Sequence, residues 1–135
     1  MRIPPDRKIL ERIYSRYYKV FASYTEGKSG RSTKVYVPVD IDDLAQHFNV
    51  DPDIIFGRLH FHLEKKYGYD QSDGTRAAFF AVEVENDPNC VNFPLLSSVL
   101  AGMQEEWNRQ RWTMGFAIVA LVLSLLSIAI TLLTS

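Results

Sequence analysis

The segment from Trp112 to Leu133 runs for 22 residues without a charged side chain. A helix needs roughly 20 residues to cross a hydrocarbon core about 30 Å thick, so this segment is long enough to span a bilayer. A buried helix of a soluble domain is usually shorter, and it is rarely apolar on every side. We therefore expect a transmembrane helix at residues 112–133, acting as a tail anchor with only Thr134 and Ser135 beyond it.

The charges beside this segment predict its orientation. Arg109 and Arg111 directly precede it, whereas no basic residue follows it. Basic flanks remain on the cytoplasmic side of a membrane. Residues 1–6 are short and polar, unlike a signal peptide. We therefore predict a single-pass protein of the cell membrane with its N-terminal domain in the cytoplasm.

Composition limits what precedes the span. About 110 residues remain, which is enough for one modest domain. Cys90 is the only cysteine, so it cannot form an internal disulfide, and this usage fits a reducing compartment. Residues 1–34 carry nine basic side chains against three acidic ones, whereas residues 35–108 carry four against thirteen. Any polyanion should therefore meet the N-terminal part first.

Residues 5–24 show the apolar spacing of an amphipathic helix. Another face of this helix carries a basic stripe, which consists of Lys8, Arg12, Arg16 and Lys19. The stripe is suited to contact anionic lipids or nucleic-acid phosphates, but an ordinary solvated face explains it equally well. A β-rich stretch follows at residues 35–39.

Two further helices are predicted in the middle of the chain. Asp40 is a suitable N-cap for a short helix at residues 41–48. Asp51 then caps a second helix, which has proline at its first position and ends before Gly68, near residue 67. Beyond it, Tyr69–Gln71 and a strand at residues 76–85 flank a turn at Asp73-Gly74, which predicts a β-hairpin.

This order of helix, strand, short helix, turn, longer helix and hairpin resembles the winged helix-turn-helix family over residues 5–86. The resemblance rests on Asp40–Tyr69 and on the Asp73-Gly74 turn as the wing. It implies an α+β fold and DNA binding, with the second helix of the pair in the major groove and the wing against the backbone or minor groove. In chain order, we predict a winged-helix-like domain at 1–86, a connector at 87–93, a juxtamembrane helix at 94–111 and the span at 112–133.

The outward face of the second helix is a poor DNA reader. With Leu59 at the centre of the buried face, steps of 100° per residue place Ile54 and Phe61 outward. The same face is predicted to hold Asp53, Gly57, Glu64 and Lys65, while His62 and Lys66 fall near the buried face. Exposed apolar pairs mark protein contacts more often than DNA contacts, so Ile54 and Phe61 are the candidate protein interface. Arg58, Lys65 and Arg76 are the candidate DNA contacts.

No reaction class is indicated by the residues. His60 and His62 are two positions apart and would point about 200° away from each other on a helix, so they cannot share a metal ion. No nucleophile has a supporting base nearby in the sequence. We expect neither an enzyme nor a metal or cofactor site.

A row of residues along the C-terminal helix has the alternating spacing of three and four that a left-handed coiled coil uses. Its candidate seam residues are Leu96, Val99, Met103, Thr113, Ala117, Ala120, Ser124, Ser127 and Thr131. Glu106 and Gln110 belong to the same row and weaken its cytoplasmic part. Small and hydroxyl-bearing residues let helices approach in lipid, which predicts a parallel homodimer. Hydroxyls that bond to their own helix are an equal alternative.

Two functions remain. The preferred hypothesis is a non-catalytic, dimeric, membrane-anchored adaptor that binds an unidentified cytoplasmic protein or acts in regulation. The alternative is a membrane-tethered DNA-binding transcriptional regulator. Charge favours the first, because the family's reading surface is here acidic and apolar.

Overall fold

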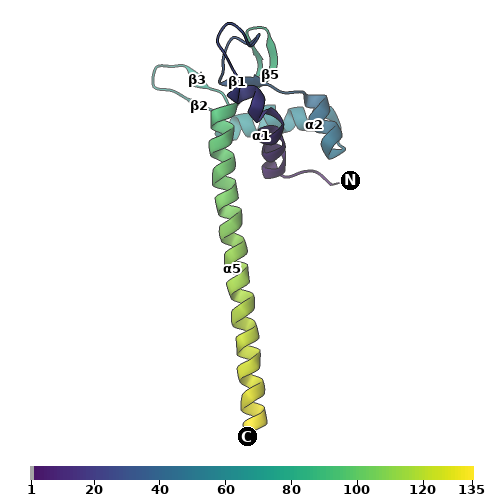
Figure 1. The fold of residues 1–135 in the computed structure, drawn as a ribbon, viewed down its shortest axis with the longest axis vertical. Helices are drawn as coiled ribbons and strands as arrows, with labels where there is room; N and C mark the ends of the chain where they lie inside the picture. The colour runs from purple at the N-terminus through teal and green to yellow at the C-terminus, as the bar shows by residue number, and fades with distance from the viewer. Residues whose placement is uncertain (1) are drawn as a thin grey trace. The chain divides into compact units, whose positions relative to one another are not determined.

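The computed structural model describes residues 2–135 (Figure 1). The chain divides into two compact units, one ending at Leu100 and the other covering Ala101–Ser135. The first unit mixes helices with small antiparallel sheets, and a long apolar helix closes the chain. The predicted α+β class with a C-terminal apolar helix is therefore confirmed.

Helix α1 spans Asp6–Ala22 and supplies one wall of the core. Pro5 precedes it, and Asp6 lies in its first turn. A carboxylate there interacts favourably with the positive end of the helix dipole. Ile9, Leu10 and Ile13 are buried, which is the i, i+1, i+4 pattern of one helical face. The amphipathic helix predicted for residues 5–24 is thus present.

Strand β1 (Tyr36–Pro38) leads into helix α2 (Ile41–Phe48). The Asp40 side chain accepts a hydrogen bond from the backbone N–H of Asp43 at 3.1 Å, as predicted for an N-cap. Asn49 ends the helix with a φ of 53°, in the left-handed region that asparagine tolerates.

The second helix of the pair is continuous but irregular. It consists of α3 (Pro52–Gly57), a π-helical segment η1 (Arg58–Leu63) and α4 (Glu64–Tyr67). Ile55, Leu59 and Leu63 are all buried at intervals of four residues. Residues four positions apart on a regular α-helix are rotated by about 40° around its axis. A π turn contains more residues, so the η1 segment offsets part of that rotation.

The strands that follow correct two predictions. Strands β2 (Tyr69–Asp70) and β3 (Arg76–Ala77) form a short hairpin of their own around the Asp73-Gly74 turn. A second hairpin, β4 (Phe80–Val84) with β5 (Asp87–Asn92), joins β1 in a sheet of order β1-β5-β4. The single strand predicted at 76–85 was wrong, because the chain leaves the first hairpin after Ala77 and pairs again elsewhere.

The connector predicted at residues 87–93 was also wrong, because these residues include the central strand of the sheet. Pro88 does not prevent this: it pairs with Glu83 of β4, and the β1 ladder reaches only from Cys90 to Asn92. A proline at the start of a strand removes no hydrogen bond from the side that is not yet paired.

Helix α5 runs without a break from Phe93 to Thr134, so the predicted juxtamembrane and membrane helices are one element. Phe93, Leu96 and Leu100 are buried in the core of the first unit. Together with β5 they extend that unit beyond residue 86.

Candidate interaction surface

Ile54 and Phe61 are exposed on the helix formed by α3, η1 and α4. Their exposed fractions are 46% and 71%, while Leu59, between them in the chain, is fully buried. The predicted outward position of both side chains is therefore confirmed. A phenyl ring this exposed buries little apolar area in the core of its own domain, so it contributes little to the stability of the fold.

Phe61 belongs to the π-helical segment and sits within an aromatic group. The His60 ring lies edge-on to Phe61 at 4.7 Å and stacks with Phe56 at 5.3 Å. Phe56 in turn meets Phe80 of the sheet edge-on at 5.8 Å. A Cβ added to Gly57 would lie 3.9 Å from the Phe61 ring. The exposed Phe61 ring therefore contacts His60, which links it to the aromatic group.

Arg58, between the two apolar residues, is held within its own chain. Its Nη1 donates to the Pro4 carbonyl at 3.0 Å and to Asp6 Oδ1 at 2.9 Å, and both partners of the ion pair are only 20% exposed. His62 Nε2 lies 3.1 Å from the second oxygen of Asp6. Arg58 is therefore paired within its own domain, which makes it less available to bind a phosphate.

This contact brings the N-terminal segment beside the helix that carries Ile54 and Phe61. Ile3 is 61% exposed and lies one residue before Pro4, whose carbonyl accepts from Arg58. Sequence reasoning missed Ile3, because only the fold brings it near a helix more than fifty positions away. His62, predicted near the buried face, has a side chain that is 51% exposed. We call Ile54 and Phe61 the apolar surface.

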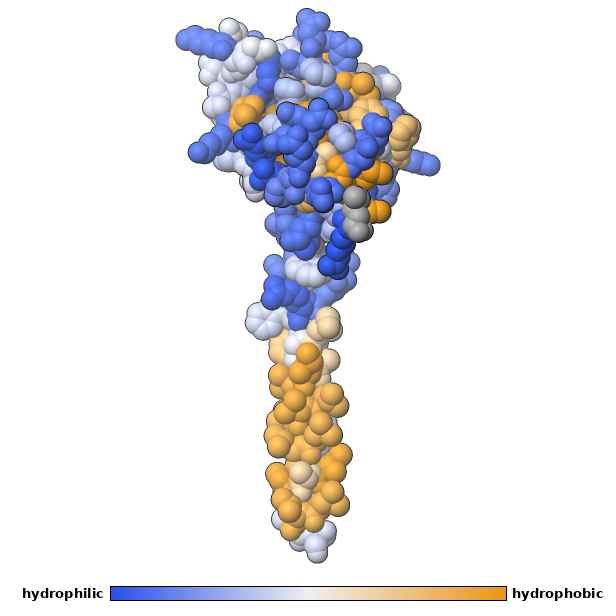
Figure 2. Space-filling model, turned by 90° about the vertical axis from the view of Figure 1, so that its right-hand side faces the viewer, coloured by the Kyte–Doolittle hydropathy of each residue, from blue (hydrophilic) through white to orange (hydrophobic). Residues whose placement is uncertain are grey.

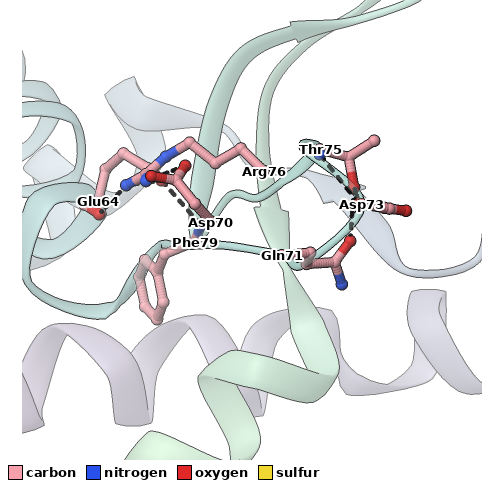
Figure 3. A network of polar contacts seen from close by, with 7 residues as sticks. All are labelled: Glu64, Asp70, Gln71, Asp73, Thr75, Arg76 and Phe79. Carbon is pink, nitrogen blue, oxygen red and sulfur yellow. Dashed lines mark hydrogen bonds and ion pairs between the residues drawn. The ribbon is translucent and has the colours of Figure 1, made fainter.

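Arg76 is likewise engaged, as Figure 3 shows. Its Nη1 donates to Asp70 at 3.2 Å, and its Nη2 donates to the backbone carbonyl of Glu64 at 3.3 Å. Glu64 Oε1 lies 3.5 Å from the same guanidinium and accepts the backbone N–H of Phe79 at 3.1 Å. Glu64 was predicted to point outward, but its side chain is only 15% exposed, because it turns toward the hairpin. Of the three DNA candidates, Lys65 is exposed, and Arg76 keeps 44% of its side chain exposed despite these contacts.

The β2–β3 turn is ordered by its own polar groups (Figure 3). Asp73 accepts from the Thr75 hydroxyl at 2.6 Å and from the Thr75 backbone N–H at 3.0 Å. These hydrogen bonds hold the pKa of the Asp73 carboxyl below its usual range. Gly74 has a φ of 88°, a conformation that favours glycine.

The four residues of the basic stripe do not form one free cationic face. Lys8 and Lys19 are exposed, and Arg12 is half-buried. Arg16 donates to Asp43 of α2 at 3.4 Å. A ligand with several phosphates would therefore meet two lysines, a half-buried arginine and an arginine paired with Asp43.

Two further side chains of the first unit have pKa values that burial raises. Burial raises the pKa of the Cys90 thiol, which lies in the central strand. Burial also raises the pKa of Tyr17, whose hydroxyl accepts the backbone N–H of Asp40 at 2.7 Å. Within residues 2–135, no three His, Cys, Asp or Glu side chains are grouped so as to hold a metal ion.

The candidate seam changes at its first member. Leu96 is fully buried in the core of its own domain, so it is not available to a second helix. Farther along α5, the hydroxyls of Thr113, Ser124, Ser127 and Thr131 donate to carbonyls of their own helix at 2.9–3.0 Å. This geometry is the predicted alternative to bonding across a seam.

Helix α5 is long and apolar enough to cross a membrane. Figure 2 shows a continuous apolar surface over its C-terminal part. Comparison with protein-family models, with curated proteins and with solved structures finds no match to this chain.

Proposed function

We propose that this chain is a single-span membrane protein whose α+β domain binds another protein through the apolar surface and catalyses no reaction. The observation that carries the proposal is the exposure of Ile54 and Phe61 on a helix whose arginine is already paired. Rigid aromatic anchors with a desolvated surround are typical of protein interfaces.

Winged-helix-like architecture is part of the proposal. The helix pair α2 and α3–η1–α4 precedes a hairpin, β4–β5, and β1 completes its sheet. The tip of the β4–β5 hairpin is acidic, since Glu83, Glu85 and Asp87 lie at or beside it. An acidic tip would repel a phosphate backbone, which supports a protein partner over DNA.

The membrane part of the proposal rests on α5. Its uncharged stretch begins directly after Arg111, and Arg109 lies two positions earlier. These flanks favour a cytoplasmic N-terminal domain at the cell membrane. A homodimer through Thr113–Thr131 remains a proposal, with the cytoplasmic seam restricted to residues beyond Leu96.

The alternative of a DNA-binding regulator has less support. Non-specific affinity for DNA rises with the number of phosphates neutralised, and two of its three candidate cations already form ion pairs with carboxylates of their own domain. Lys65 is exposed, and the paired Arg76 keeps 44% of its side chain exposed. DNA binding that weakens on Lys65→Ala and with added salt would favour this alternative.

Photocrosslinking in intact membranes tests the protein-interface proposal. A photoreactive phenylalanine at position 61 should give a discrete protein adduct that is lost on Ile54→Asp. The matched control carries the same probe at Val82, which is 48% exposed on strand β4. Equal adducts from both positions, or an adduct at position 61 that survives Ile54→Asp in a folded domain, would contradict the proposal.

A further inference from the structure

One face of α5 changes from polar to apolar within two turns. Asn108, Arg111, Trp112 and Gly115 are spaced i, i+3, i+4 and i+7, so they lie along one stripe of the helix. They line an open groove of about 310 Å³.

Gly115 lies at the C-terminal end of this stripe, among the residues that line the groove with the tryptophan. A Cβ added there would meet nothing within 4 Å, so the position is open. Trp112 forms one wall, is 69% exposed, and has its ring centroid 5.9 Å from that of Phe116. The lower wall of the groove is therefore apolar and aromatic.

The upper end of the groove carries hydrogen-bond donors and one positive charge. Arg111 is exposed and is the last charged residue before the uncharged stretch. Its guanidinium offers a planar fork that matches two phosphate oxygens. The Asn108 amide and the Trp112 indole N–H are further donors on the same stripe.

We infer that this groove binds the headgroup phosphate of a membrane phospholipid, with the glycerol and the start of an acyl chain beside Trp112 and Gly115. Charge complementarity selects the phosphate, and the sharp change from donors to apolar surface matches the boundary between headgroup and hydrocarbon. The inference rests on the proposed insertion of α5 into a bilayer. It adds a preferred lipid contact on one side of the helix, which a plain anchor does not have.

Spin-label experiments on the full chain in phosphatidylcholine vesicles test this. Spin-labelled phosphatidylglycerol should associate with the protein about fivefold more strongly than spin-labelled diacylglycerol, which lacks phosphate. Arg111→Gln should remove most of that preference. Arg109→Gln is the matched control, because residue 109 lies about 200° around the helix from residue 111 and should have the smaller effect.

A second pair of variants tests the shape of the groove. Gly115→Leu should lower the preference by filling the space beside Trp112, whereas Ala117→Leu, on the opposite side, should leave it unchanged. Equal effects within either pair would overturn the groove and indicate general attraction by basic residues. Alkaline extraction distinguishes failure of the proposed membrane insertion from failure of the lipid contact. Release of the chain from vesicles would overturn both. Retention of the chain without lipid preference would overturn this inference alone.

Discussion

The Arg58 guanidinium donates to the Asp6 carboxylate at 2.9 Å, joining residues 52 positions apart in the chain. The contact fastens the start of α1 to the π-helical segment that carries Phe61. It also removes Arg58 from the positive charge that this helix could offer to DNA.

Loss of this ion pair should destabilise the domain. We expect Arg58→Ala to lower the free energy of unfolding by about 1–3 kcal/mol, because a largely buried carboxylate loses a charged hydrogen-bond partner. Lys65→Ala, at an exposed neighbouring position, should change it by less than about 0.5 kcal/mol. Hydrogen exchange of peptides from residues 41–67, measured on the full chain in detergent micelles, reports both. Equal protection in the two variants would contradict the structural role of Arg58.

Gly68 is predicted to tolerate no side chain. A Cβ there would contact the Glu64 carboxylate and would lie 2.7 Å from both the Glu64 carbonyl oxygen and Arg76 Nη2. Gly68→Ala should therefore lower stability by about 1–3 kcal/mol through crowding. Its φ of −66° is ordinary for alanine, so backbone strain is not the cause.

Gly102→Ala is the matched control for that substitution. Gly102 lies inside α5 with nothing within 4 Å of an added Cβ. The change should stabilise the helix by about 0.5–1 kcal/mol, because alanine loses less backbone entropy than glycine. Helix content against temperature, followed by circular dichroism for both variants, distinguishes the two effects. A Gly68→Ala variant as stable as Gly102→Ala would show that the region around Glu64 rearranges freely.

The Cys90 thiol should react slowly while the domain is folded. Burial raises its pKa, so little thiolate is present near neutral pH, and its side chain is enclosed in the central strand. Ellman's reagent should modify Lys65→Cys rapidly and Cys90 only after urea is added. Rapid modification of Cys90 without denaturant would mean that β5 opens on the time scale of the assay.

The β2–β3 turn should loosen in acid. Hydrogen bonds from Thr75 lower the pKa of Asp73 from 3.8. A carboxyl whose pKa is lowered by folding stabilises the folded turn above the unfolded pKa, and that contribution is lost as pH falls through the folded value. The Thr75 amide resonance should therefore shift toward its unfolded position below about pH 4, and Asp73→Asn should remove this dependence. An unchanged titration in Asp73→Asn would assign the effect to another carboxyl.

The sequence alone determined the features that depend on neighbouring residues. The charge-free stretch, the N-caps at Asp40 and Asp51 and the glycine end of the second helix all follow from chemistry within one or two turns. The outward placement of Ile54 and Phe61 also follows, because helical periodicity fixes which residues share a face with Leu59.

Only the tertiary structure decided which strands pair and which cations are free. The polar stretch Asp87–Asn92 becomes the central strand because β1 and β4 supply partners on both sides, and its local sequence does not encode them. Arg58 and Arg76 form ion pairs with Asp6 and Glu64, which approach them only when the chain folds, and the Arg76 side chain stays 44% exposed. Leu96 is buried in the core of its own domain, so it is not available to the candidate seam. Long-range packing therefore determines which residues of a predicted surface are free to contact a partner.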